Sequence, residues 1–129
     1  EAALKLKEIA YVPTQECPAG EMKHGPLALI EQGTLAVVGA TQADTRDKLA
    51  SNIRELQARG GHVLGITTKD DALVPPVCDS VCQLPQTGDW FLNALLSVVP
   101  LQLFSYYMAL ERGCEIDQPR NLAKSVTVE

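Results

Sequence analysis

The sequence predicts an α/β fold with three layers (α/β/α), in which a mostly parallel sheet is flanked by helices and followed by an extended carboxy-terminal tail. Two apolar runs, 34–40 and 62–67, have the length of strands that are covered on both faces. A helical pattern separates them, so residues 34–67 form a βαβ unit, from which parallel sheets are built. A chain of 129 residues is long enough for one domain with its own core.

The amino-terminal part alternates between short helical and extended patterns. Residues 1–9 have apolar side chains at helical spacing and predict an amphipathic helix. Residues 10–12 are rich in β-formers, and Pro13 limits them to a strand end or an edge strand. Glycines and a proline bracket residues 20–26, which predicts a short helix or loop there and a helical turn at 27–30.

The helix of the βαβ unit is expected to begin at Asp44 as its N-cap and to end at Gly60 and Gly61. Residues 77–84 then predict a weaker third strand, and 85–89 a turn. An apolar helix follows over 90–111, kinked or divided at Pro100 and ended by Gly113. Residues 114–129 show no period and form the tail.

Composition excludes several classes of function. The net charge of −5 and the isoelectric point near 5.0 argue against nucleic acid as a partner. Pro100 and Gln102 interrupt the most apolar region, which argues against a membrane span. The amino terminus lacks an export signal, so we expect a cytoplasmic protein, and it lacks an initiator Met, so we expect a piece of a longer chain. The four cysteines are expected to be free thiols rather than disulfides or metal ligands.

Basic side chains gather near the two ends of the sequence. If the fold brings these ends together, a small anion finds a cationic pocket; the alternative is that they are solvated surface residues. His24 lies on a glycine-bracketed turn where it can titrate near neutrality, although a solvated loop histidine has the same pattern. His62, at the start of a strand, is expected to be structural. The basic residues are Lys5, Lys7, Lys23, His24, Arg120 and Lys124.

The common nucleotide-binding motifs are absent. Neither G-x-x-x-x-G-K-[ST] nor G-x-G-x-x-G occurs, so ATP and NAD are not supported and we expect no cofactor and no metal. The carboxyl ends of the strands are where a ligand binds in a sheet of this type, but the fold alone indicates no reaction.

Three segments closely resemble the glucosamine-6-phosphate synthase family, the isomerising glutamine:fructose-6-phosphate amidotransferases. They are Lys-Leu-Lys-Glu-Ile-Ala-Tyr (5–11), Ala-Gly-Glu-Met-Lys-His-Gly-Pro-Leu-Ala-Leu-Ile (19–30) and Asp-Gln-Pro-Arg-Asn-Leu-Ala-Lys-Ser-Val-Thr-Val-Glu (117–129). The resemblance spans essentially the whole chain and is to the second of the two sugar-isomerase (SIS) subdomains. It implies that residues 1–129 are one SIS subdomain whose tail is 114–129.

The resemblance also implies roles for individual residues. Glu8 is then the base that moves a proton between C1 and C2 of the sugar, and Lys124 forms a Schiff base with the open-chain ketose. His24 helps to open the sugar ring and reaches the site of the neighbouring subunit in the family. For substrate binding, Lys5 is near the developing enolamine, Ala123 is beside the sugar, and Arg120 opens the tail loop that covers the pocket.

The implied partners are a phosphosugar substrate, the first SIS and glutaminase domains of the parent chain, and a second copy in a homodimer. The family's phosphate-binding loop and ammonia source lie in those other domains, so we expect this chain to be inactive alone. A non-catalytic SIS module that senses a phosphosugar is the alternative. It needs neither a proton-transferring base such as Glu8 nor an imine-forming amine such as Lys124.

Overall fold

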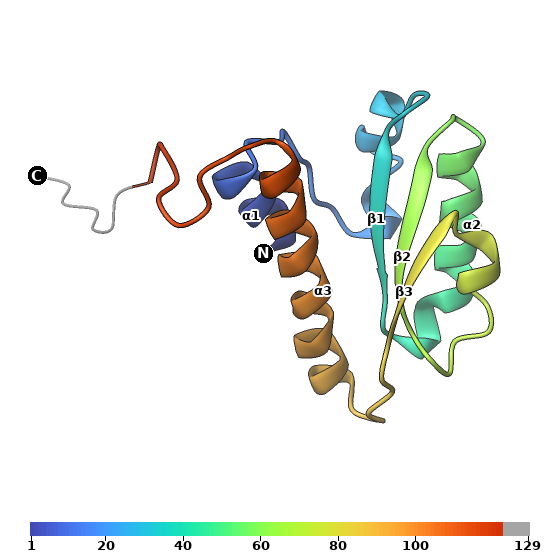
Figure 1. The fold of residues 1–129 in the computed structure, drawn as a ribbon. Coiled ribbons are helices and arrows are strands. Elements are labelled where there is room, and N and C mark those ends of the chain that lie inside the picture. Colours follow the sequence, from blue (N-terminus) through green and yellow to red (C-terminus); the bar gives the residue numbers. More distant parts are fainter. Residues whose placement is uncertain (123–129) are drawn as a thin grey trace, which may run out of the picture. The chain divides into compact units, whose positions relative to one another are not determined.

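The computed structural model describes residues 1–122, and the chain forms two compact units (Figure 1). One unit contains residues 17–97. The other combines residues 1–16 with the chain from residue 98 onward. Each unit has its own apolar cluster, so each is described by itself.

The unit of residues 17–97 is built on a parallel sheet of three strands, which confirms the predicted α/β class. The strands are β1 (Leu35–Ala40), β2 (His62–Thr68) and β3 (Ser80–Leu84), in the order β1-β2-β3. Leu35 is opposite His62, and Leu64 is opposite Ser80. All three carboxyl ends therefore meet at one edge of the sheet (Figure 1).

Helix α2 (Arg46–Gln57) packs its apolar stripe against this sheet. Leu49, Ile53 and Leu56 recur at helical spacing and are buried, as the sequence pattern predicts. They form one cluster with further buried side chains: Met22, Leu27, Ala40, Val63 and Val74. This packing fixes the start of α2 at the edge where β1 ends.

The sequence prediction is wrong for the start of α2 and correct for its end. Asp44 is not the N-cap, because a 3₁₀ turn over Ala43–Thr45 precedes the helix, and the Thr45 hydroxyl donates back to the Gln42 carbonyl at 3.1 Å. The glycine stop is confirmed. Gly60 has a φ of +88°, and Gly61 donates its N–H to the Leu56 carbonyl at 3.1 Å, as in a Schellman motif.

Short 3₁₀ helices occupy Ala19–Glu21, Pro26–Leu29 and Pro75–Val77. The first two confirm the short helical turns predicted for that part of the sequence. The third takes up the start of the predicted strand 77–84, because Pro75 and Pro76 have no N–H to donate to a sheet.

The other unit joins α1 (Ala2–Ile9) to the later part of α3 (Trp90–Glu111) (Figure 1). Leu6, Ala10 and Ala109 are buried together at its centre. Gly113 ends α3 with a φ of +64°, and Cys114 donates its N–H to the Ala109 carbonyl at 2.9 Å. The predicted glycine stop is therefore confirmed here too.

The predicted edge strand at 10–12 is wrong. The backbone of Tyr11 is left-handed, with a φ of 54°, and Val12 donates its N–H back to the Leu6 carbonyl at 3.1 Å. This arrangement satisfies the end of α1. A backbone that turns back on the helix cannot extend into a strand, even though the residue types favour one.

Helix α3 is continuous through Pro100 and is not divided there. Proline removes one helical hydrogen bond, but the other bonds of a 22-residue helix remain.

By length and composition α3 could cross a membrane, with a mean hydropathy of 1.3 in its most apolar window, of which 11% is buried. The sequence argument that Pro100 and Gln102 interrupt this region is therefore wrong. Helices whose apolar side is covered by protein meet the same criterion, so it does not assign a membrane.

All four cysteines are free, which agrees with the sequence prediction. Burial, aided by the charges of Asp79 and Asp71, raises the pKa of the Cys78 thiol. Cys78 is therefore a packing residue rather than a reactive thiolate.

Candidate active site

The last turns of α1 present two of the predicted site residues, Lys5 and Glu8. They are three positions apart in a helix, which places them on one face, and their charged atoms are 2.7 Å apart. Both side chains are partly exposed, at 35% for Lys5 and 24% for Glu8. A carboxylate held on a rigid helix and still open to solvent can accept and return a proton.

The ion pair also determines the chemistry of Lys5. The hydrogen bond to Glu8 is the main cause that raises the pKa of Lys5. Lys5 therefore remains an ammonium ion, which stabilises negative charge but cannot attack a carbonyl group. An ammonium ion of this kind is suited to binding an anion rather than to acting as a nucleophile.

Arg120 contacts Tyr11, the residue after the C-cap of α1. The backbone N–H of Arg120 donates to the Tyr11 hydroxyl at 2.9 Å, and the guanidinium carbon lies 4.1 Å from the centre of the Tyr11 ring. Near its described end, the tail thus lies against the residue that follows the C-cap of the helix that carries Glu8. Ala123 and Lys124, the other two predicted tail residues, lie outside the described residues.

A pocket of about 410 Å³ lies beside this contact, within the same unit. Two arginines and one glutamate contribute to its lining, which is Tyr11, Arg112, Gly113, Cys114, Glu115 and Arg120. The two ends of the sequence therefore do come together here, as the anion-pocket hypothesis required.

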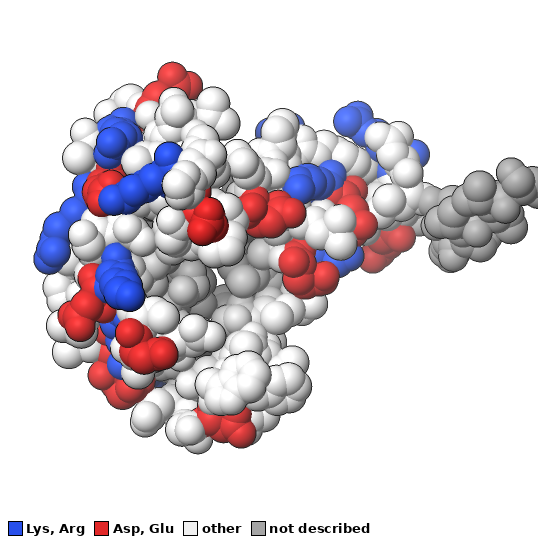
Figure 2. Space-filling view, turned by 180° about the vertical axis from the view of Figure 1, so that it is seen from behind, with Lys and Arg blue, Asp and Glu red and all other residues white. Residues whose placement is uncertain are grey.

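Other basic residues named in that hypothesis are already paired. Lys7 contacts Glu16 at 3.1 Å, and Lys23 contacts Glu55 at 2.7 Å. On the face shown in Figure 2, basic side chains are interspersed with acidic ones rather than gathered in one patch. The solvated-surface alternative therefore applies to Lys7 and Lys23.

His24 belongs to the unit of residues 17–97 and lies on an exposed turn, as predicted. Its backbone N–H donates to the Glu21 carbonyl at 3.0 Å, and Gly25 follows with a φ of +134°. The imidazole is 75% exposed and lies 4.0 Å from the Glu21 carboxylate. An exposed imidazole on a glycine turn is free to reach a ligand or a neighbouring molecule.

His62 starts β2, and its ring lies 3.3 Å from the Ser80 hydroxyl across the strand pair. This contact between neighbouring strands agrees with the structural role predicted for His62.

The carboxyl edge of the sheet holds a second pocket, of about 510 Å³. Polar side chains from the segments after β1, β2 and β3 dominate its lining, which is Thr41, Gln42, Ala43, Asp44, Arg46, Asp70, Gln86, Gly88, Trp90 and Asn93. This is the edge at which the sequence analysis places a ligand site.

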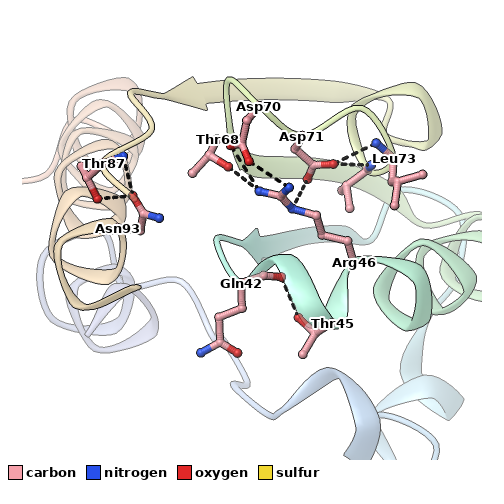
Figure 3. Close-up of polar contacts among 10 residues, drawn as sticks. Gln42, Thr45, Arg46, Thr68, Asp70, Asp71, Leu73, Thr87 and Asn93 are labelled. Atoms are coloured by element: carbon pink, nitrogen blue, oxygen red, sulfur yellow. Dashed lines mark hydrogen bonds and ion pairs between the residues drawn. The ribbon is translucent and has the colours of Figure 1, made fainter. Parts of the chain in front are cut away.

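Arg46 dominates the electrostatics of this edge but was not identified from the sequence (Figure 3). Its side chain is 10% exposed and donates to Thr68 at 2.6 Å and to Asp70 at 3.1 and 3.4 Å. Its Nε lies 3.3 Å from the wholly buried carboxylate of Asp71. The Asp70 carboxylate accepts hydrogen bonds from Thr68 and from Arg46, and these two bonds, that from Thr68 first, lower the pKa of Asp70.

These contacts decide what the edge pocket can hold. The donor groups of Arg46 face Thr68 and two carboxylates, and Asp44 adds a further negative charge. A phosphate group would meet these carboxylates rather than a free guanidinium. The lining of this pocket is therefore unfavourable for a phosphate group.

A signal for this network was present in the sequence. Arg46 lies in the first turn of the predicted helix after one buried strand, and Asp70 and Asp71 follow the next. Charged residues at the carboxyl ends of adjacent parallel strands share one edge of the sheet.

Comparison with known protein families identifies the family to which this architecture belongs. The model described as "SIS domain" matches residues 1–112, which include both units through the end of α3. The chain belongs to the SIS domain family. The parallel sheet and its helices are thus the SIS fold, which confirms the prediction of a SIS subdomain.

Relatives of this SIS domain are longer proteins. A glutamine–fructose-6-phosphate aminotransferase [isomerizing] from Caldanaerobacter subterraneus is 53% identical over 129 residues, all of this chain and 21% of the relative. A protein of the same name from Clostridium tetani is 50% identical over the same span. The chain therefore spans about a fifth of the length of these relatives.

A solved structure has the same fold. The C-terminal domain of glucosamine-fructose-6-phosphate aminotransferase from Francisella tularensis is 38% identical, with a TM-score of 0.80 over 92% of this chain and 33% of its own. The similarity of sequence and fold extends across both units.

Proposed function

We propose that this SIS domain is the carboxy-terminal part of an enzyme that converts fructose 6-phosphate and glutamine-derived ammonia into glucosamine 6-phosphate. The observation that carries the proposal is the 50–53% identity, over the whole chain, to proteins named for that reaction. The pairing of Lys5 with Glu8 on α1 supports it further, because it joins a carboxylate to a fixed positive charge.

In this proposal Lys124 and Glu8 divide the chemistry. The amine of Lys124 attacks the C2 ketone of the open-chain sugar and releases water to form an imine. Ammonia then replaces the lysine at C2, because the nitrogen of the product comes from glutamine. Glu8 takes a proton from C1 to give an enolamine and returns it to C2, which leaves an aldehyde at C1 and an amine at C2.

The remaining predicted residues assist these steps. Lys5, held protonated by Glu8, stabilises the oxygen anion that develops at the enolamine stage. The exposed His24 assists ring opening, in the site of a neighbouring subunit of a homodimer. Ala123 contacts the sugar through its backbone, and Arg120 begins the loop that excludes water from it.

The proposal includes the rest of the protein. A first SIS domain supplies the phosphate-binding loop, and a glutaminase domain supplies ammonia. We further propose that the enzyme acts in the cytoplasm. The edge pocket supports this division, because it presents carboxylates where a phosphate-binding site would need hydrogen-bond donors.

The test is Glu8→Gln in the full-length protein. Glutamine keeps an oxygen that can accept from Lys5 but cannot act as a base, so isotope exchange at C1 of fructose 6-phosphate should fall by about 10²–10⁴-fold with little change in binding. Glu16→Gln is the matched control, since Glu16 is also paired with a lysine of α1 but has no assigned role. Exchange at the normal rate in Glu8→Gln would remove Glu8 from the mechanism, whereas an absence of exchange in the unmodified full-length protein would favour the sensing module over the enzyme.

A further inference from the structure

The edge pocket, at the carboxyl ends of the strands, has the size of a small-molecule site. Its volume is about 510 Å³, and pockets that bind small ligands measure roughly 300–1,000 Å³. All of its lining residues belong to the unit of residues 17–97. None of them has a role in the proposed reaction, so the pocket requires an explanation of its own.

Asn93 presents a buried hydrogen-bond donor to the edge pocket. It is 8% exposed, and its side-chain oxygen accepts the Thr87 N–H at 3.3 Å and the Thr87 hydroxyl at 2.8 Å. Because a backbone N–H can only donate, the oxygen faces Thr87 and the amide nitrogen is turned away from it (Figure 3). Within residues 1–122 this nitrogen donates no hydrogen bond. A buried donor that lines a pocket in this way indicates a ligand atom that accepts from it.

The first turn of α3 adds an aromatic surface beside Asn93. The Asp89 carboxylate accepts the N–H groups of Phe91 at 2.7 Å and Leu92 at 3.3 Å, which fixes this turn. Trp90 lines the pocket and is 70% exposed, and its ring meets that of Phe91 edge-to-face, with 6.0 Å between the ring centres. An exposed indole at a pocket offers a flat apolar face, against which the C–H groups of a sugar ring can pack.

The charges around the edge pocket favour a cation. The one basic residue in its described lining is Arg46, whose guanidinium already faces Asp70 and Asp71. Asp44 also lines the pocket and forms no ion pair within residues 1–122, and the Asp70 side chain is still 35% exposed. Carboxylates therefore outnumber basic groups here. A ligand with an ammonium group compensates this negative charge, whereas a phosphate group adds to it.

Side-chain amides complete the lining. Gln42 follows β1, Gln86 follows β3, and Asn93 belongs to α3. An amide group both donates and accepts hydrogen bonds, as a sugar hydroxyl group does, so a hydroxyl-rich ligand can satisfy all three. The combination of amides, carboxylates and an exposed indole ring is therefore suited to a sugar that carries a positive charge.

From these features we propose that the edge pocket binds an amino sugar with a free ammonium group and no phosphate. The sugar ring packs on Trp90, and the Asn93 amide nitrogen donates to a hydroxyl oxygen. The ammonium group donates to the carboxylates of Asp44 and Asp70. This is a second ligand site, beyond the phosphosugar of the proposed function, and it does not rest on that function because Glu8 takes no part in it.

Trp90 is the single tryptophan of the sequence, so its fluorescence reports directly on the edge pocket. Glucosamine, glucose and glucosamine 6-phosphate are titrated into the 129-residue chain. Glucosamine should shift the emission of Trp90 in a saturable way. Glucose should bind about 2–10-fold more weakly, because it lacks one charged hydrogen bond. Glucosamine 6-phosphate should bind more weakly than glucosamine by about 10-fold or more, because its phosphate meets the carboxylates.

Three variants locate the contacts, and circular dichroism checks that each keeps its fold. Asp44→Asn should weaken glucosamine binding about 2–10-fold and leave glucose binding nearly unchanged. Asp47→Asn is the matched control, because it removes the same charge from an exposed side chain of α2 outside the pocket, and it should change neither affinity. Trp90→Leu, measured by calorimetry, should weaken both sugars about 2–10-fold, because it removes the aromatic face.

Saturable binding of glucosamine that Asp44→Asn weakens and Asp47→Asn leaves intact would support the site. The absence of a saturable response to glucosamine, or an equal loss in Asp44→Asn and Asp47→Asn, would overturn it. Equal affinity for glucosamine and its 6-phosphate would also overturn it. Putrescine, a diamine without hydroxyl groups, should bind more weakly than glucosamine; equally tight binding would show that the pocket recognises charge alone and not a sugar.

Discussion

Replacement of Arg46 by methionine should strongly destabilise the unit of residues 17–97. Methionine replaces the apolar stem of the side chain but removes the charge. The Asp71 carboxylate, which is 0% exposed, would then lose the guanidinium 3.3 Å away and remain buried without a counter-charge. Removal of one partner from a buried ion pair costs about 3–5 kcal/mol.

Urea unfolding of the 129-residue chain, followed by circular dichroism, measures this cost. At a slope of about 2 kcal/mol per molar urea, the midpoint should fall by roughly 1.5–2.5 M. Asp70→Asn is the matched control, since the Asp70 side chain is 35% exposed and water replaces its contact with Arg46, so its effect should be much smaller.

A double variant examines the cause. Addition of Asp71→Asn to Arg46→Met removes the stranded charge, and the asparagine oxygen still accepts the N–H groups of Leu73 and Val74. The double variant should therefore be no less stable than Arg46→Met. A further loss of about 1 kcal/mol or more, or an equal cost for Asp70→Asn, would refute the reasoning that a buried carboxylate causes the instability.

Three further predictions follow from the structure. Gly65→Ala should destabilise the chain by about 1–3 kcal/mol, because its Cβ would lie 2.7 Å from the Cys78 sulfur, whereas Gly39→Ala meets nothing within 4 Å; urea midpoints of the pair compare them. Hydrogen bonds lower the pKa values of two carboxyls, chiefly the bond from Thr68 for Asp70 and that from Gln57 for Asp79. Both carboxylates therefore stabilise the fold at pH values above 3.8, the pKa in the unfolded chain, and this contribution is lost as the pH falls through their pKa values in the folded protein. Thermal melts from pH 7 to pH 2 should show the loss, and a flat profile would contradict it. The isolated chain should self-associate through the exposed apolar side chains of α3, and a strictly monomeric species in sedimentation velocity would contradict this.

Local sequence signals predicted the regular elements of this SIS domain. The apolar runs became β1 and β2, although only β2 is mostly buried as expected, whereas β1 is half-buried or exposed except at Ala40. Gly60 and Gly113 ended their helices because each adopts a positive φ that glycine tolerates. The exposed turn at His24 and the pairing of Lys5 with Glu8 also follow from spacing of a few residues. Such signals depend on neighbours within one or two turns.

The features that the sequence did not reveal depend on distant partners. Arg46 pairs with residues more than twenty positions away, and its buried network becomes evident only when adjacent strands are in register. Tyr11 looked like a strand residue by type, yet its conformation is set by α1 behind it and by Arg120, 109 positions further on. Residue propensity cannot anticipate either contact.

The division of the chain into two units also determines the order in which its contacts can form during synthesis. Residues 17–97 are contiguous, so the sheet and α2 can assemble as soon as that stretch has left the ribosome. The cluster of Leu6, Ala10 and Ala109 joins segments about a hundred positions apart, so this contact between α1 and α3 cannot form until α3 has emerged. The contact that holds the helix carrying Glu8 against α3 therefore forms only after both ends of a long loop have been made, and closing so long a loop adds an entropic cost to this docking.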